Sequence, residues 1–496
     1  MRRVPLLALL FLAALASVLR AQSTNASLTG RVTDPAKAVI VGAKVVAISA
    51  GTNVRYETTT NDSGKYYLAN LPPGLYRLEI EKAGFKKLTK PNVTLHVQDA
   101  LSLDFEMTIG SVSESVTVEA GAPLANTESA AVSTVVDRTF VENLPLNGRS
   151  FQSLIALTPG VVLTKATLGE QGQFSVNGQR ADANYFTVDG VSANVGVTAG
   201  GGLGQGASGA LPGVSAFGSM NNLVSVDALE EFKIQTSTYA PEFGRRTPGG
   251  QVQISTRSGT NGFHGTLFEY FRNDALDANN WFNNSLRLRK PAMRQNDFGG
   301  VLGGPIVRNR AFFFFSCEGL RLRQPQTMLT IVPTTAARQS VPADLQPYLN
   351  AYPLPNGTDF GNGTAQFNAT YSNPSTLNAT SLRLDSQLTS RINLWGRYNY
   401  APSSSDERGP FGTSVSDLSE ARFKTQTLTL GSVQSISPRI SNELRANYSR
   451  NSARDSLMID SFGGAVSPPV SDLFPPGRTV QDSSFLFSWL VRIFTR

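Results

Sequence analysis

Apolar and polar residues alternate with a period of two through much of the chain, and this alternation predicts β-strands. Residues 28–33 (L-T-G-R-V-T) alternate up to a turn at Asp34, and strands at Tyr66–Asn70 and Tyr76–Glu81 flank a Pro-Pro-Gly turn. Short strands separated by tight turns are typical of antiparallel β structure. We therefore predict a small β-sandwich over residues 22–110.

From Phe263 onward the alternation continues, but one face of each strand is now charged or amidic. The hairpin over residues 382–400 sets Leu382, Leu384, Leu388, Ile392, Leu394, Tyr398 and Tyr400 against Arg383, Asp385, Gln387, Thr389, Arg391, Asn393, Arg397 and Asn399. Transmembrane β-strands have this pattern, with apolar side chains toward lipid and polar ones toward a wet lumen. A soluble sandwich also alternates, but it rarely puts so many charges on one face. We predict an antiparallel transmembrane β-barrel sheet over residues 259–496.

The stretch between these two regions mixes helices with strands. Thr127–Asp137 is β-prone, whereas Asp137–Leu144 and Arg149–Leu157 can form short helices, which Leu-Pro and Thr-Pro steps end. Phe174–Val191 predicts a strand, a polar loop and a second strand that closes with an Asp-Gly turn. We predict an α+β domain over residues 111–258, so the fold class is mainly β.

Two further stretches of this domain differ from their surroundings. Gly196–Gly218 is rich in Gly, Ala and Ser and is predicted to be a loop. Its G-x-G spacing has no strand before it and no helix after it, so a phosphate-binding loop is not predicted. Val226–Phe232 spaces Leu229 and Phe232 as on a helix, and Lys233–Thr236 is expected to be extended.

The first 21 residues have the pattern of an export signal. Arg2 and Arg3 precede an apolar run from Val4 to Leu19, and Ala21 supplies a small residue for cleavage. This predicts a secretory signal peptide over residues 1–21. No later segment has 18 consecutive apolar residues, so a membrane-spanning mature chain is expected to cross as a β-barrel.

Composition narrows the functional classes. Charged residues make up 16% of the chain, below the roughly 25% of ordinary soluble proteins, and the net charge of +7 is scattered rather than concentrated. No nucleic-acid partner is therefore expected. Cys317 is the only cysteine and is expected to be a small core residue, and the two histidines, His96 and His264, lack metal-ligand spacing. No catalytic group, metal or cofactor is predicted, and we do not expect an enzyme.

Several motifs of the α+β domain occur together in a distinctive order. They are L-P-L-N-G-R-S-F at 144–151, L-T-P-G-V at 157–161, the Phe174–Val191 stretch, V-D-A-L-E-E-F-K-I-Q-T at 226–236, Y-A-P-E-F-G at 239–244 and G-G-Q-V-Q-I-S-T-R-S-G at 249–259. Over Val112–Gly259 the chain resembles the plug domain of TonB-dependent outer-membrane receptors of the Oar-like type. Residues 262–274, 294–306 and 312–321 resemble the first barrel strands of that family.

The N-terminal β-sandwich has a resemblance of its own. Its pattern G-R-V-T-D, G-A-K-V and N-D-S-G-K-Y-Y-L-A-N-L-P-P-G-L-Y-R-L-E-I, followed by G-F, is similar to the carboxypeptidase regulatory-like domain. That domain is not the catalytic part of the peptidases. The resemblance implies a periplasmic adaptor or spacer, and a sandwich without any ligand is equally compatible.

The family resemblance implies two candidate sites. A TonB box, the short extended segment that pairs with the energy-transducing TonB protein, is matched by Glu114, Ser115, Val116, Thr117, Val118, Glu119 and Ala120. The alternative is that residues 116–118 form the last strand of the sandwich. Candidates for the apical loops of the plug are Gln179, Arg180, Asp182 and Asp189.

The resemblance also implies a barrel larger than this chain supplies. Barrels of these transporters have about 22 strands, which at about 10 residues each need roughly 220 residues in strands alone. Gln324–Asn378 and Pro402–Ala421 lack sustained alternation and are expected to be loops, which leaves about seven or eight clear strands. The tail Phe485–Arg496 has no period of two. We expect an incomplete barrel, as in a fragment of a receptor.

The resemblance implies an outer-membrane TonB-dependent receptor that binds an external ligand and takes it up with energy from the TonB complex. Its expected partners are TonB, outer-membrane lipid and an extracellular ligand of unknown identity. Two alternatives stay open: a non-transporting surface receptor or adhesin, and a soluble exported β-sandwich protein.

Overall fold

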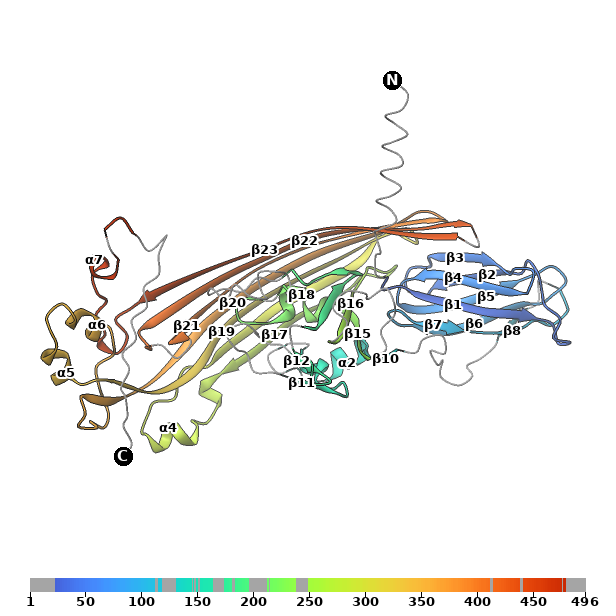
Figure 1. Ribbon diagram of the computed structural model, residues 1–496. Helices are drawn as coiled ribbons and strands as arrows, with labels where there is room; N and C mark the ends of the chain where they lie inside the picture. The colour runs from blue at the N-terminus through green and yellow to red at the C-terminus, as the bar shows by residue number, and fades with distance from the viewer. Residues whose placement is uncertain are drawn as a thin grey trace, which may run out of the picture.

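The computed structural model describes residues 23–478 except 112–114, 118–130, 145, 147–148, 150–151, 164–173, 181–182, 196–211, 214, 238–248, 411–413, 438–439 and 475. The predicted signal peptide, the tail at 485–496 and most of the Gly-rich stretch at 196–218 lie outside these residues. Three parts follow one another along the chain: a β-sandwich, a smaller α+β domain and a long curved sheet (Figure 1).

The N-terminal part is a sandwich of two sheets, as predicted. One sheet has the order β4-β1-β7 with β8 also on β1, and the other has the order β3-β2-β5-β6-β9. The strands are β1 (Ala26–Thr33), β2 (Lys44–Ser49), β3 (Arg55–Thr59), β4 (Lys65–Leu71), β5 (Gly74–Glu81), β6 (Lys87–Leu95), β7 (Ala100–Ser102), β8 (Phe105–Glu106) and β9 (Ser115–Thr117). Inward residues of both sheets, such as Leu28, Val45 and Leu78, are fully buried, because alternate side chains face the partner sheet.

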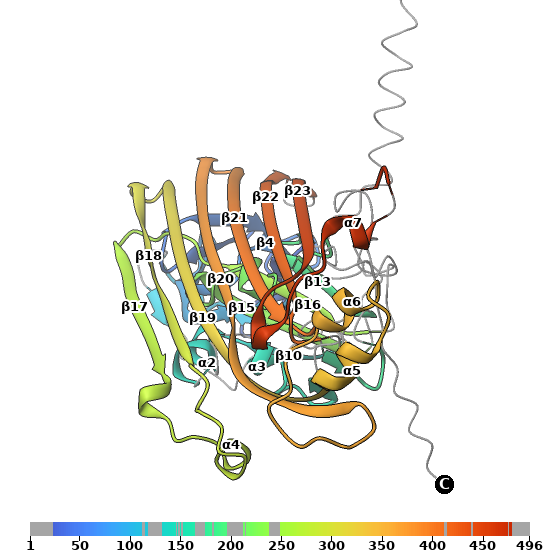
Figure 2. The ribbon, with the colours of Figure 1, turned by 90° about the vertical axis from the view of Figure 1, so that its left-hand side faces the viewer.

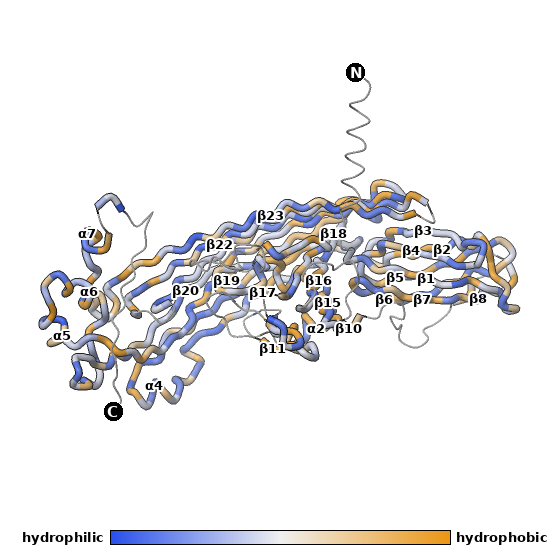
Figure 3. Tube along the Cα trace, viewed as in Figure 1, coloured by the Kyte–Doolittle hydropathy of each residue, from blue (hydrophilic) through white to orange (hydrophobic). Residues whose placement is uncertain are grey.

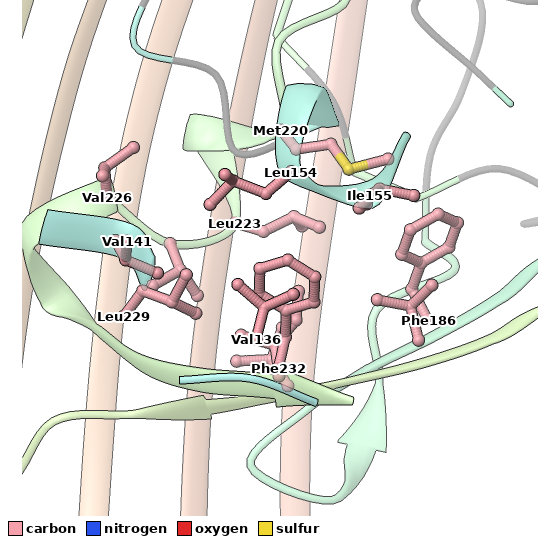
Figure 4. Close-up of a cluster of buried hydrophobic side chains, with 14 of the residues drawn as sticks. Val136, Val141, Leu154, Ile155, Phe186, Met220, Leu223, Val226, Leu229 and Phe232 are labelled. Carbon is pink, nitrogen blue, oxygen red and sulfur yellow. The ribbon is translucent and has the colours of Figure 1, made fainter. Parts of the chain in front are cut away.

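The α+β domain is built on a mixed sheet of order β10-β15-β16-β13-β14, with a separate β11-β12 hairpin. Its elements are β10 (Val132–Val136), α2 (Arg138–Asn143), α3 (Gln152–Ile155), β11 (Val161–Leu163), β12 (Phe174–Val176), β13 (Tyr185–Val188), β14 (Val191–Ser192), η4 (Met220–Asn222), η5 (Val226–Ala228), β15 (Leu229–Ser237) and β16 (Gln251–Thr256). The core in Figure 4 joins Val141 of α2, Leu154 and Ile155 of α3, and Phe232 of the sheet.

Both short helices occur where the sequence predicts them. Asp137 caps α2, since its side chain accepts a hydrogen bond from the Phe140 amide at 3.1 Å. The helical expectation for Val226–Phe232 is wrong beyond Ala228. The chain turns only through η5 and is already extended at Leu229, because β15 pairs with both β10 and β16. Sheet pairing thus overrides the local spacing of Leu229 and Phe232.

The third part is an antiparallel sheet of seven strands in sequence order, β17 to β23. The strands are β17 (His264–Asn273), β18 (Arg294–Val307), β19 (Ala311–Pro333), β20 (Thr364–Thr389), β21 (Ile392–Arg408), β22 (Asp417–Ser437) and β23 (Ile440–Ile459). Figure 2 shows the sheet curving over the α+β domain as one wall of a barrel. Within the described residues β17 and β23 do not pair with each other, so the sheet is open.

The strands are longer than the alternation suggests. Much of Gln324–Asn378 and Pro402–Ala421, expected to be loop, continues the strands: β19 and β20 pair without interruption from Ala311↔Ser386 to Pro333↔Thr364. Polar and proline-containing segments here stay extended because each finds a main-chain partner on the neighbouring strand. The remaining helices are short and lie at or near the far end of the wall: η7 (Asp274–Leu276), α4 (Trp281–Ser285), α5 (Thr335–Ser340), α6 (Gln346–Asn350), η9 (Phe462–Gly464) and α7 (Val470–Leu473).

None of the helices in the described ranges is long and apolar enough to cross a membrane.

Candidate functional site

The two faces of the seven-stranded wall differ in chemistry, as the alternation predicts. On the outer face Leu382, Leu384 and Tyr398 are 41%, 46% and 44% exposed, whereas on the inner face Arg397 and Thr425 are at most 4% exposed. Figure 3 shows the mixture of apolar and polar residues along these strands. An apolar outside and a polar inside are the arrangement of a membrane barrel wall. Cys317, expected to be a core residue, is exposed, because its position on β19 turns it to the outer face.

One contact between the α+β domain and the wall is centred on Asp189, at the turn after β13. Its carboxylate accepts hydrogen bonds from the Thr256 amide and hydroxyl at 2.9–3.0 Å. Arg383 of the wall lies 3.3 Å from Asp189 Oδ1, and Arg397 Nη1 lies 3.9 Å from Oδ2. Arg383 is also paired with Asp385 at 3.0 Å. Two carboxylates thus neutralise two buried guanidinium groups where the α+β domain meets the inner face of the wall. This boundary is called the seam below.

A second contact uses neutral polar groups around η4. Asn222 donates to the Thr425 hydroxyl at 2.6 Å, and Asn399 donates to the Asn222 carbonyl at 3.1 Å. Arg397 donates to the Leu223 carbonyl at 2.8 Å. These groups are almost completely buried, so their hydrogen bonds replace those that water would make. The fit between the α+β domain and the wall therefore depends on the positions of neutral donors and acceptors as well as on charge.

A third contact surrounds Arg149, which is 7% exposed. Its guanidinium pairs with Asp227, lies 3.8 Å from Asp297 of β18, and stacks over the rings of Phe268 and Tyr270 of β17 at 4.5 and 4.3 Å. Beside it, Asn221 donates to Glu318 of β19 at 2.7 Å. One cation from the α+β domain thus contacts one carboxylate and two aromatic rings of the wall. Together, the three contacts fasten this domain to the inner face.

The sandwich contacts the same domain through buried side chains of β15. His96 Nδ1 lies 2.8 Å from Glu231, and Lys233 Nζ lies 3.1 Å from the Val97 carbonyl and 3.7 Å from Asp99. The hydrogen bond with Glu231 raises the pKa of His96 above its usual 6.5, despite partial burial. Burial lowers the pKa of Lys233, which is 3% exposed. The junction between the sandwich and the α+β domain therefore contains paired charges that are shielded from water.

The sandwich touches the rim of the wall mainly through neutral groups. Asn53 donates to Asn309, Asn70 to Ser441 and the Asn261 amide to the Gly51 carbonyl, at 2.8–3.0 Å. These contacts join the sandwich to the end of the wall that lies beside it. A cavity of about 730 Å³ lies between the three parts and is lined by residues that include Tyr56, Arg138, Glu230, Arg257 and Arg383.

The candidate TonB box is described only at Ser115–Thr117. These three residues form β9, which pairs in parallel with β6 in the register Leu88↔Val116, and the Val116 side chain is 37% exposed. Glu114, Val118, Glu119 and Ala120 lie outside the described residues. The segment thus occupies the edge of the sandwich sheet, and the covalent path from β9 leads into the α+β domain.

The apical-loop candidates are separated. Gln179 and Arg180 are exposed in the turn after β12, and Asp182 lies outside the described residues. Asp189 is buried in the seam and faces the sandwich end of the wall. Arg149 and Asn221, with their wall partners Asp297 and Glu318, were not predicted as site residues. Arg149 stands in the L-N-G-R-S-F motif, but motif membership alone does not reveal a buried guanidinium.

Comparisons with known families match all three parts. A carboxypeptidase regulatory-like domain matches residues 27–108, a TonB-dependent receptor plug domain matches 125–251, and an outer membrane β-barrel domain matches 255–345 and 340–475. The α+β domain is therefore a plug, called so below, and the barrel domain places the chain in the cell outer membrane.

Individual relatives extend beyond this chain. The TonB-dependent transporter Oar from Myxococcus xanthus is 28% identical over 296 residues, which cover 55% of this chain and 24% of Oar. The outer membrane transporter YddB from Escherichia coli is 12% identical with a TM-score of 0.43, covering 65% of this chain and 39% of YddB. The siderophore receptor PirA from Acinetobacter baumannii is 14% identical with a TM-score of 0.37, covering 66% and 45%. The chain spans about a quarter of Oar.

The order of the three domains and the similarity to Oar agree with the family resemblance that the plug motifs indicated. The chain thus has, in order, a carboxypeptidase regulatory-like domain, a TonB-dependent receptor plug domain and an outer membrane β-barrel domain, and it is similar to the TonB-dependent transporter Oar.

Proposed function

We propose that the protein binds an extracellular ligand and takes it up across the outer membrane with energy supplied through TonB. The observation that carries this proposal is the plug held against the polar inner face of an outward-apolar wall, with Asp189 and Arg149 at its charged contacts. A plug held against the wall by hydrogen bonds and ion pairs, without a crosslink between the two faces, can be displaced without breaking a covalent bond. No covalent bond of the ligand is broken in this process, so no enzyme activity is proposed.

The segment around Ser115–Thr117 is the proposed point of attachment for TonB. It is the edge strand of one sandwich sheet and precedes the plug in the chain, so a pull on it acts on both. An extended segment can pair with a foreign strand through its main chain, which gives affinity without a pocket. The plug contacts must then break in sequence, beginning near the sandwich end, where Asp189 meets the wall.

The attachment can be tested with single substitutions in the intact receptor. Val116→Pro removes a main-chain donor, whereas Val116→Thr keeps the strand-forming tendency. A purified periplasmic TonB domain should capture the wild type and Val116→Thr, and it should not capture Val116→Pro or a deletion of Glu114–Ala120. Undiminished capture of the deletion variant would refute the assignment of this segment.

The alternative is a receptor or adhesin that binds its ligand but does not transport it. The fastening of the plug to the wall at three separate contacts favours this alternative, since every contact must open for passage. Uptake of radiolabelled ligand, once a ligand is found by growth on defined nutrients, separates the two functions. Ligand binding without TonB-dependent accumulation would establish the non-transporting form.

A further inference from the structure

The hairpin loop between β17 and β18 lies at the level of the membrane surface. The His264 end of β17 is beside the sandwich, where the Asn261 amide bonds to the Gly51 carbonyl, so Asn273 is at the opposite, outer end (Figure 1). Ten residues at about 3.3 Å each, tilted by about 40°, rise about 25 Å, which is the height of the apolar band of a membrane barrel. Residues 274–294, here called the α4 segment, therefore begin where the hydrocarbon ends.

The α4 segment exposes large apolar side chains. Leu276, Trp281 and Phe282 are 78%, 73% and 69% exposed, and the two rings pack edge to face at 5.2 Å. The backbone beneath them is held in place: Asn283 is fully buried and accepts a hydrogen bond from Thr327 of β19 at 2.8 Å. A fixed helix that presents two aromatic rings outward has a surface suited to a partner.

The same segment carries cations without acidic partners. Arg287, Arg289 and Arg294 are exposed, and among the described residues none of them forms an ion pair. Two neighbouring cations already have partners in the segment: Arg272 lies 3.8 Å from Asp277, and Lys290 donates to the Asp277 carbonyl at 2.9 Å. Three guanidinium groups beside an apolar patch fit a surface of phosphate groups over hydrocarbon.

The apolar patch continues a surface that already faces lipid. On the outer face of the adjoining strands, Leu267 is 91% exposed, Phe271 60% and Phe298 41%. Phe271 is three residues before the α4 segment. Because aromatic side chains gather at the boundary between hydrocarbon and headgroups, the step from Phe271 to Trp281 crosses that boundary.

We propose that the α4 segment docks on the outer leaflet of the outer membrane, with Trp281 and Phe282 inserted at the headgroup boundary and the three arginines bound to phosphate groups of phosphorylated lipid. This contact anchors the first hairpin of the wall at a fixed depth. The partner is a lipid surface with exposed phosphates, and the proposal is independent of which ligand the receptor carries.

The test places an environment-sensitive NBD fluorophore on the segment. Cys317 is the only cysteine, so a Cys317→Ser background with Phe282→Cys can be labelled at one position in the full chain. The matched control is Phe360→Cys, another exposed phenylalanine, in the loop beyond the long strands β19 and β20. Labelled proteins are inserted into phosphatidylcholine vesicles, alone or mixed with diphosphorylated lipid A. Heat-modifiable gel mobility confirms that each variant is assembled.

The expected result is a blue-shifted, brighter emission at position 282 that grows with lipid A, and a water-like emission at position 360. The variant with Arg287→Gln, Arg289→Gln and Arg294→Gln should need roughly tenfold or more lipid A for the same change, since each basic side chain near an anionic surface strengthens binding about fivefold. The corresponding triple lysine variant keeps the charge and should keep most of the response.

Three results would overturn the proposal. A water-like probe at position 282 in both kinds of vesicle shows that the segment does not reach the membrane. A blue shift that is equal without lipid A, or in the triple glutamine variant, shows that phosphate plays no part. A blue shift already present in detergent, and abolished by dilution, shows that a second copy of the chain covers the patch.

Discussion

Asp189→Asn is the most direct perturbation of the contact between plug and wall. Asparagine has nearly the same shape, so the change removes charge and leaves packing intact. Arg383 keeps Asp385 at 3.0 Å, but Arg397 loses its only carboxylate within 4 Å among the described residues. Arg397 then keeps only the Leu223 carbonyl, Ser381 and Asn399 as neutral acceptors.

The expected loss of stability depends on the partners that the two arginines keep. Removing one partner of a buried ion pair costs about 3–5 kcal/mol, because the other charge is left uncompensated. Asp385 and the neutral acceptors offset part of this cost, so we expect about 2–3 kcal/mol. With a urea dependence of about 2 kcal/mol per molar, the midpoint of plug release should fall by about 1 M.

Pulse proteolysis of the detergent-solubilised chain across a urea series measures the release of the plug. Asp406→Asn is the matched control, since Asp406 pairs with Arg422 at 2.6 Å in a partly exposed position on the same wall. That exposed pair should contribute less than about 1 kcal/mol. Equal midpoints for the two variants would refute the view that Asp189 holds the plug.

Three further predictions address the other parts of the molecule. Because the hydrogen bond with Glu231 raises the pKa of His96, its stabilisation is complete below pH 6.5 and is lost as the pH rises through the raised pKa; hydrogen-exchange protection at the sandwich–plug junction, corrected for the intrinsic pH dependence of exchange, should therefore fall from pH 6 to pH 8.5, and His96→Gln should abolish this fall. Leu384→Arg, five residues from the hairpin turn and 46% exposed, should destabilise the wall in vesicles by about 2–4 kcal/mol but have little effect in a water-facing sheet; urea unfolding from vesicles measures it, and no change would contradict the membrane assignment. Phe232→Ala should cost about 3–5 kcal/mol in plug stability, because the ring is fully buried, and a smaller loss in denaturation would mean that the core of Figure 4 repacks.

Local sequence patterns were sufficient to predict which face of each wall strand is apolar and where most helices and strands lie. The alternation around Leu382 and Arg383 predicts which side chains face lipid and which face the lumen, and the exposures agree. The Leu-Pro and Thr-Pro steps predict where α2 and α3 end. These features depend on residues within a few positions of one another, so a single stretch of sequence contains the information.

Strand length and the end of the helical turn at Ala228 were not predictable in this way. Residues 364–378 stay extended because β19 lies alongside them, and Leu229 is extended because two strands pair with β15. Main-chain hydrogen bonds to a neighbour stabilise an extended segment whatever its own alternation. Such bonds are visible only when the neighbour is in place.

The sequence alone determined the three domains, their order, and the apolar outer face of the wall, since these follow from motifs and from the period of two. Only the tertiary structure decided that Asp189 meets Arg383, 194 positions away, and that Arg149 lies against Asp297 and Asn221 against Glu318. Alternation tells which face a side chain is on, but its partner depends on sheet register, on the curvature of the wall and on how the plug is seated. Those are properties of the assembled chain.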